Sequence, residues 1–147
     1  MTEAIIADDQ LLFEFERGTL PAEAFHHEQH VRTAWLFVRR DGMPDALTTF
    51  SAALRRFAAA NGAPRLYHVT ITWAYLLLIA ERQRACEARE WASFASANRD
   101  LLAWKPSILD VYYTPDTLWS EAARATFVMP DRGLSSGCGA GDAANQT

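Results

Sequence analysis

The sequence predicts an all-α fold, a bundle of four main helices with short helical additions in the C-terminal third of the chain. Three observations predict it. Most of the chain consists of helix-compatible residues, and its apolar residues recur three and four apart, as in Leu47, Phe50, Leu54 and Phe57. Turn-forming residues interrupt this pattern at Gly18, Asp41-Gly42, Asn61-Gly62 and Pro106. At 147 residues the chain is long enough for one domain and too short for two ordinary ones.

These interruptions set the bounds of the expected helices. A short first helix covers about residues 8–16, and longer ones cover about 21–40, 44–61, 66–84 and 87–98. Pro21 suits the first turn of its helix, because its missing N–H would have no partner there in any case. After Pro106 we expect short pieces, first over residues 107–113 and then in a helix that begins at Thr114-Pro115 and ends before Pro130.

One segment has a pattern that also fits a strand. Residues 67–72, YHVTIT, alternate and are rich in β-branched side chains. We predict a helix there, since the chain offers no second strand to pair with it and residues 73–84 continue in strong helix formers. The bundle then occupies residues 1–133 as a single helical domain. Residues 134–147 are small, polar and rich in glycine, which predicts a disordered C-terminal tail.

Charge and composition exclude several classes of partner. The formal net charge is −4, and its 18 acidic and 14 basic residues are spread along the chain without a basic stripe, so nucleic acid is not expected as a partner. The N-terminus lacks the pattern of a signal peptide, and the most apolar run, residues 71–80, is about half the length that a bilayer needs. Cys86 and Cys138 are too far apart in sequence to suggest a ligand pair or a disulfide framework. We therefore expect a cytoplasmic protein with no membrane partner and no nucleotide cofactor.

The four histidines are placed where two of the expected helices begin. His26, His27 and His30 lie near the start of the 21–40 helix, and His68 lies near the start of the 66–84 helix. Short connections favour antiparallel neighbours, so these two helices run parallel and begin at the same end of the bundle. Helical periodicity puts His27 and His30 beneath the inward face of the first of them, which is marked by Val31, Ala34, Trp35 and Val38.

This cluster predicts a metal site. The positive end of a helix favours neutral imidazole, which is the form that binds a metal. We expect His27, His30 and His68 to hold one divalent transition metal ion, zinc or iron, with His26 as a fourth ligand or an acid/base group. The protein would then be a small metal-dependent enzyme of hydrolase or group-transfer type acting on a small-molecule substrate. Glu28 or Tyr113 would handle protons in that enzyme.

Other interpretations of the same cluster stay open. No HExxH, HxH or other established ligand spacing is present, and buried histidines often only form hydrogen bonds in a core. The histidines could line a metal-free polar pocket, for acid/base work or for binding an anion, with Tyr67, Thr72 and Tyr75 beside them. In that case the alternative function is a non-catalytic helical module that binds a small molecule or a protein partner. The sequence does not predict an oligomeric state.

Three short motifs carry a resemblance to other proteins. They are F-H-H-x-x-H at residues 25–30, Y-H-x-T at residues 67–70 and Y-Y-x-P at residues 112–115. In this combination, over most of residues 10–132, the chain resembles a widespread group of small, uncharacterised bacterial all-helical proteins. The resemblance implies the helical fold and no particular reaction. The idea of a bundle that holds a metal with three histidines is similar to helical proteins of the DinB type, without matching motifs.

Overall fold

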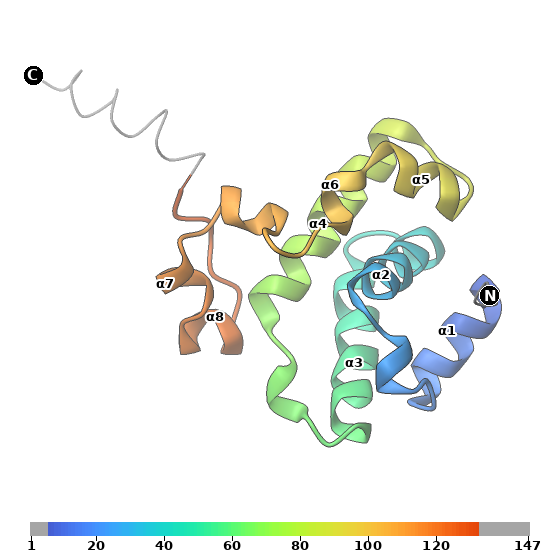
Figure 1. Ribbon diagram of the computed structural model, residues 1–147, viewed down its shortest axis with the longest axis horizontal. Helices are drawn as coiled ribbons and strands as arrows, with labels where there is room; N and C mark the ends of the chain where they lie inside the picture. The colour runs from blue at the N-terminus through green and yellow to red at the C-terminus, as the bar shows by residue number, and fades with distance from the viewer. Residues whose placement is uncertain (1–5, 133–147) are drawn as a thin grey trace, which may run out of the picture.

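Three long helices form the centre of the molecule: α2 (His27–Asp41), α3 (Asp45–Ala60) and α4 (Val69–Cys86) (Figure 1). The computed structural model describes residues 6–132, so the predicted tail at 134–147 lies outside the described residues. Helix α1 (Asp8–Arg17) packs against α2 and α3. Over residues 6–132 the chain forms no β-strand, which confirms the predicted all-α fold. Every helix in this range is too short or too polar to cross a lipid bilayer.

The ambiguous segment at residues 67–72 is helical from Val69 onward. His68 caps α4, because its ring accepts a hydrogen bond from the backbone N–H of Ile71 at 3.1 Å. The threonines that gave the segment its strand-like pattern are both buried, and the hydroxyl of Thr70 donates to the backbone carbonyl of Thr126 at 2.8 Å. Burial on more than one side of a central helix accounts for the β-branched composition.

Several predicted boundaries are wrong, and each for a local reason. The helix expected from residue 21 begins at His27, since η1 (Ala22–Ala24) is a separate turn and Phe25 leaves helical geometry to stack on Phe15 at 5.1 Å. The helix expected from residue 66 begins at Val69, after the turn η2 (Pro64–Leu66). The single helix expected over 87–98 is shorter, α5 (Trp91–Ala97), and α6 (Arg99–Leu102) follows it.

The C-terminal third is built from short pieces, as predicted, but they are shorter than expected. After η3 (Ile108–Val111), the helix expected from Thr114 to before Pro130 is two helices, α7 (Pro115–Leu118) and α8 (Glu121–Ala125). They are separate because Ser120 starts a new helix: its hydroxyl accepts a hydrogen bond from the backbone N–H of Ala123 at 3.1 Å. Helix α8 packs against α4, on the left of the view in Figure 1.

Aromatic side chains fill the core between α1, α2 and α3. The ring of Phe15 lies within 5.9 Å, centroid to centroid, of four other rings, those of Phe25, Phe37, Phe50 and Phe57. The residues predicted to mark the inward face of α2 are all buried, but so are the others from Arg32 to Phe37, so this central helix is buried on every side.

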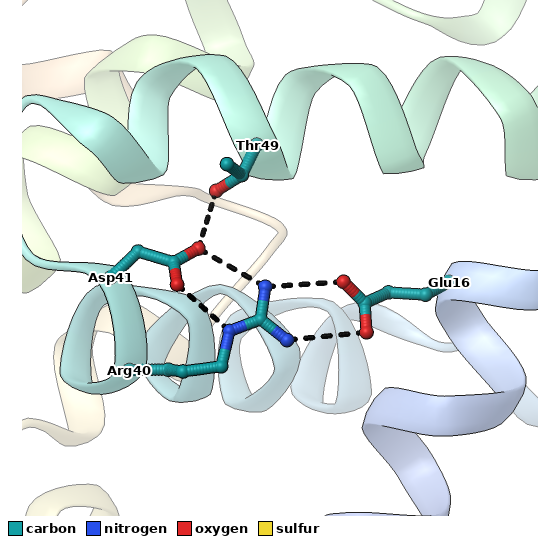
Figure 2. Close-up of polar contacts among 4 residues, drawn as sticks. All are labelled: Glu16, Arg40, Asp41 and Thr49. Carbon is teal, nitrogen blue, oxygen red and sulfur yellow. Dashed lines mark hydrogen bonds and ion pairs between the residues drawn. The ribbon is translucent and has the colours of Figure 1, made fainter.

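A polar cluster ties the same three helices together at the surface. Figure 2 shows the Arg40 guanidinium between the carboxylates of Glu16 on α1 and Asp41 on α2, and Thr49 on α3 donates to Asp41 at 2.6 Å. The hydrogen bonds from Arg40, and to a lesser degree the one from Thr49, hold the pKa of the Asp41 carboxyl below its usual value. The cluster fixes the end of α2 that lies away from the histidines.

The segment after α8 is anchored back onto the body of the protein. Thr70 accepts from the backbone N–H of Val128 at 3.0 Å, and the Tyr113 hydroxyl donates to the carbonyl of Val128 at 2.7 Å. The Asp131 carboxylate accepts hydrogen bonds from Thr114 and Thr117. Residues of the Y-H-x-T and Y-Y-x-P motifs thus hold the C-terminal helices in place.

A histidine-lined cavity as the candidate functional site

A cavity of about 710 Å³ lies where α2 and α4 begin and α3 ends. The turn before α4 and the C-terminal segment complete its wall. Most of the lining is apolar, and six aromatic residues contribute to it: Phe25, Phe57, Tyr67, Tyr75, Trp104 and Trp119. Its other polar residues are His27, His30, Asn61, His68, Thr72 and Arg124. The structure therefore brings three of the four histidines to one cavity, from the two helices that the sequence places side by side.

The rim of the cavity is apolar and open to solvent. Leu66 is 78% exposed, Trp119 is 54% exposed and Trp104 is 39% exposed, and all three residues also line the cavity. Exposed large apolar side chains around a concavity are typical of a ligand-binding site.

His27 is held by a hydrogen bond to the chain. Its Nε2 lies 3.0 Å from the backbone carbonyl of Leu101. Because a carbonyl only accepts, Nε2 carries the proton, and Nδ1 of the neutral ring is a free acceptor. The ring packs against Trp104 at 4.9 Å and against Tyr75 at 5.3 Å, centroid to centroid. Burial lowers the pKa of His27, although the bond to Leu101 opposes this, so the ring is neutral at pH 7.

His30 sits between phenylalanines. Its ring lies 4.8 Å from that of Phe25 and 6.0 Å from that of Phe50. Burial, aided by the charge of His27, lowers the pKa of His30 to about 4. Among residues 6–132 no protein group hydrogen-bonds to its ring nitrogens, and the residue is partly exposed where it lines the cavity. A neutral imidazole has one donor and one acceptor, and at His30 both are unused.

His68 differs, because both of its ring nitrogens are occupied. Nδ1 accepts from the backbone N–H of Ile71 at 3.1 Å, and Nε2 donates to the carbonyl of Leu118 at 2.7 Å. Burial lowers its pKa, and the positive charge of Arg124 acts in the same direction. His68 therefore joins the start of α4 to the end of α7, and it has no lone pair left for another partner.

This pattern of hydrogen bonds fits a three-histidine metal site poorly. If His68 bound a metal through Nδ1, the hydrogen bond from the backbone N–H of Ile71 that caps α4 would be lost. If it bound through Nε2, that nitrogen would lose its proton and with it the hydrogen bond to the carbonyl of Leu118. Within residues 6–132 no three His, Cys, Asp or Glu side chains are grouped so that they could hold one ion. Among residues 6–132, the histidine nitrogens of the cavity without a protein partner are Nδ1 of His27 and both nitrogens of His30.

The residues expected to handle protons lie elsewhere. His26 is the exposed N-cap residue of α2, Glu28 is exposed in the first turn of that helix, and neither lines the cavity. Tyr113 is buried and outside the cavity lining, and its hydroxyl is used by the carbonyl of Val128. In contrast, the three polar side chains expected beside the histidines, Tyr67, Thr72 and Tyr75, all line the cavity.

Two further polar groups of the lining lack partners. Tyr75 is 6% exposed, and its buried hydroxyl makes no hydrogen bond within the described part of the chain. Burial, with a smaller effect of the Asp110 charge, raises the pKa of Tyr75 to about 12, so the hydroxyl keeps its proton; the Ser107 side chain lies near enough to oppose the shift without forming a well-aligned hydrogen bond. Arg124 donates from Nη1 to the carbonyl of Arg65, while its buried Nε is without a hydrogen bond among residues 6–132.

Sequence reasoning missed Arg124 and Trp119. Both belong to the short C-terminal pieces, and nothing in their local sequence distinguishes them from ordinary surface residues. Their position in the cavity depends on how the C-terminal segment folds back onto α4, which is a long-range property.

Comparison with known proteins adds no assignment. The chain matches no protein-family model, and it has no significant match among curated proteins or solved structures. A function is therefore proposed from the chemistry of the cavity.

Proposed function

We propose that this protein is a metal-free binding module whose cavity takes a small, largely apolar organic molecule. One observation carries the proposal: a cavity of about 710 Å³ with aromatic walls presents unused hydrogen-bonding atoms of His27, His30 and Tyr75. Its volume falls within the range of about 300 to 1,000 Å³ that is usual for small-molecule sites. A few convergent polar groups in an apolar pocket are likewise typical of such sites.

The unused polar atoms give the cavity its affinity for a ligand. For the buried hydroxyl of Tyr75 the lack of a partner costs about 1 to 3 kcal/mol, and a ligand that supplies the partner recovers part of this; the partly exposed His27 and His30 add hydrogen bonds to the ligand in exchange for bonds to water. The aromatic walls contribute the apolar contact, since stacked or edge-to-face ring pairs add about 0.5 to 1.5 kcal/mol each beyond the area they bury. His68 supports the cavity wall and does not contact the ligand through a free nitrogen. Its two hydrogen bonds fix the start of α4 to the end of α7, next to Trp119.

Binding can be tested with small neutral probes. Phenylacetamide and octanamide, titrated by calorimetry, should bind with a stoichiometry of one and raise the melting temperature. Trp104 and Trp119 line the cavity, so the intrinsic fluorescence should change with the same affinity.

A matched pair of variants locates the binding site. Ala58 lines the cavity near the end of α3, whereas Ala59 is exposed on the same helix and lies outside the lining. Ala58→Leu should weaken probe binding at least tenfold by filling the cavity, and Ala59→Leu should leave it unchanged. Trp119→Ala, at an exposed rim position, provides a second variant that removes contact area without overpacking.

The opposite outcome is equally definite. Untagged protein could instead contain stoichiometric zinc or iron that is lost in both His30→Ala and His68→Ala. If a chelator also lowered the melting temperature of the wild type, these results would replace this proposal with a metal-dependent enzyme. Equal probe binding in the Ala58→Leu and Ala59→Leu variants would place the ligand outside the cavity.

A further inference from the structure

We propose that the ligand of this cavity is a monocarboxylic acid with an aromatic or aliphatic body, its carboxylate held by Arg124 near the start of α4, with the Tyr75 hydroxyl as a second donor of the cavity wall. The inference rests on the proposed function and names the class of molecule that the cavity takes. Three independent features of the cavity carry it: the sign of its charges, the helix ends that face it and the buried donor within it.

The charge of the cavity wall is positive. Arg124 is the one ionised side chain among the lining residues at pH 7, and none of them is Asp or Glu. The carboxylate nearest to Arg124 is that of Glu121, 3.9 Å from Nε. Glu121 has a side chain 77% exposed to solvent and also pairs with Arg65 at 3.3 Å, so it neutralises Arg124 only in part. A cationic ligand would meet Arg124 with only the partial compensation of Glu121, while Asp110, outside the lining, acts on Tyr75.

Helix ends add to this positive potential. Helices α2 and α4, of 15 and 18 residues, both begin at the cavity, and each N-terminus carries the equivalent of about half a positive charge. Helix α3 ends there, but its last carbonyls are occupied: that of Phe57 by Asn61, that of Ala58 by Ala63 and that of Ala59 by Gly62. The N-termini of α2 and α4 are capped by His26 and His68, so it is the dipoles of these two helices that favour an anion.

The cavity wall also contains a buried donor without an acceptor. Tyr75 is 94% buried, lines the cavity and has a hydroxyl with no partner within residues 6–132. The hydroxyl stays protonated, so it can donate to a carboxylate oxygen. The neutral ring of His30, which also lines the cavity, can present a further N–H to a ligand. Charge-assisted hydrogen bonds of this kind are about twice as strong as neutral ones.

The number of donors fits a single negative charge. Phosphate groups carry up to two charges and three acceptor oxygens, and their sites commonly gather several Arg or Lys side chains. This cavity has one arginine and no lysine in its lining. The remaining wall is aromatic and aliphatic, which suits a hydrocarbon body attached to one carboxylate.

Isosteric pairs of probes test the charge directly. Calorimetry at pH 7 and low salt should show phenylacetate binding at least tenfold more tightly than phenylacetamide, and octanoate at least tenfold more tightly than octanamide. The amide keeps the shape and size of the acid, so the ratio within each pair isolates the contribution of the negative charge.

Two arginine variants assign that contribution. Arg124→Gln should weaken acid binding more than amide binding and so reduce the acid-to-amide ratio at least fivefold. Arg56→Gln is the matched control: Arg56 is exposed on α3 and lies outside the cavity lining, so the ratio should stay within twofold of wild type. Tyr75→Phe, which removes only the hydroxyl, should reduce the ratio about threefold and serves as a second test if Arg124→Gln does not fold.

The outcomes separate this inference from the proposed function. Amides that bind as tightly as their acids would overturn the carboxylate and leave the binding module standing. An acid preference that persists in both Arg124→Gln and Tyr75→Phe would place the carboxylate elsewhere and overturn the assignment. If neither acids nor amides bind, both proposals fail.

Discussion

At the scale of single residues, two buried tyrosine hydroxyls differ in what they contact. The hydroxyl of Tyr113 donates to the carbonyl of Val128, whereas that of Tyr75 has no partner among residues 6–132. Tyr113→Phe should therefore destabilise the fold by about 1 kcal/mol. Tyr75→Phe should leave the free energy of unfolding unchanged or increase it by up to about 1 kcal/mol, because it removes an unsatisfied polar group. Urea denaturation of both variants measures the difference, and equal losses would show that Tyr75 has a partner after all.

His30 makes stability depend on pH. Its pKa is about 4 in the folded protein and about 6.5 in the unfolded chain, so between these values the unfolded chain binds more protons. The contribution of the neutral His30 ring to the free energy of unfolding is complete above pH 6.5. It decreases as the pH is lowered and is lost by about pH 4. The loss amounts to about 2 kcal/mol at pH 5.

Denaturation at pH 7 and pH 5 checks this prediction. The pKa values of His27 and His68 are lowered as well, so they contribute in the same direction. The comparison is therefore between wild type and His30→Gln, whose loss of stability from pH 7 to pH 5 should be smaller by about 2 kcal/mol. An identical pH dependence in the two proteins would mean that His30 is not neutral in the fold.

At the scale of secondary-structure elements, His68 has the role usually taken by serine, threonine or aspartate at the start of a helix. It caps α4 and also bonds to the carbonyl of Leu118, so His68→Ala should cost about 2 to 4 kcal/mol from a lost cap and a lost buried hydrogen bond. His68→Asn keeps a capping group and should recover about 1 kcal/mol. Both free energies of unfolding are measured on chelator-treated protein. There, substitution of a residue that acted only as a metal ligand would not change the stability.

The same cap explains which helix boundaries could be predicted from the sequence. Where Gly18 and Asn61-Gly62 end helices, the predicted and observed ends agree within a residue. The starts of α2 and α4 were misplaced by several residues, because histidine is not a usual N-cap and no local pattern marks His26 or His68 as one. Pro21, a good first-turn residue, begins a separate turn instead, because the ring of Phe25 packs onto Phe15.

At the scale of the whole molecule, Trp35 lies at the centre of the packing between α2, α4 and α5. It is fully buried, packs on Trp91 and Phe94, and its indole N–H donates to the side chain of Gln83 at 2.8 Å. Trp35→Ala should therefore cost about 3 to 5 kcal/mol. Glu90→Ala, at the exposed start of α5, should stay within about 0.5 kcal/mol. Thermal or urea melts compare the two, and similar stabilities would contradict the packing described.

The candidate site could be predicted from the sequence only in part. Helix direction and short connections were enough to bring His27, His30 and His68 to one end of the bundle, and all three line the cavity. The hydrogen bonds that occupy both nitrogens of His68 could not be predicted, since one of them reaches a carbonyl 50 residues away. Arg124 was missed for the same reason: its place in the cavity depends on contacts between α8 and α4, not on a local pattern.

Those distant contacts also bear on the order in which the protein folds. Thr70 bonds to residues 56 and 58 positions later in the chain, and these bonds hold the segment that carries one wall of the cavity. Contacts of such separation close long loops and tend to form after the local helical pairs of the bundle. A molecule that binds the completed cavity then stabilises contacts absent from the folding transition state. It should lengthen the lifetime of the native protein by slowing unfolding, while the rate of refolding stays the same.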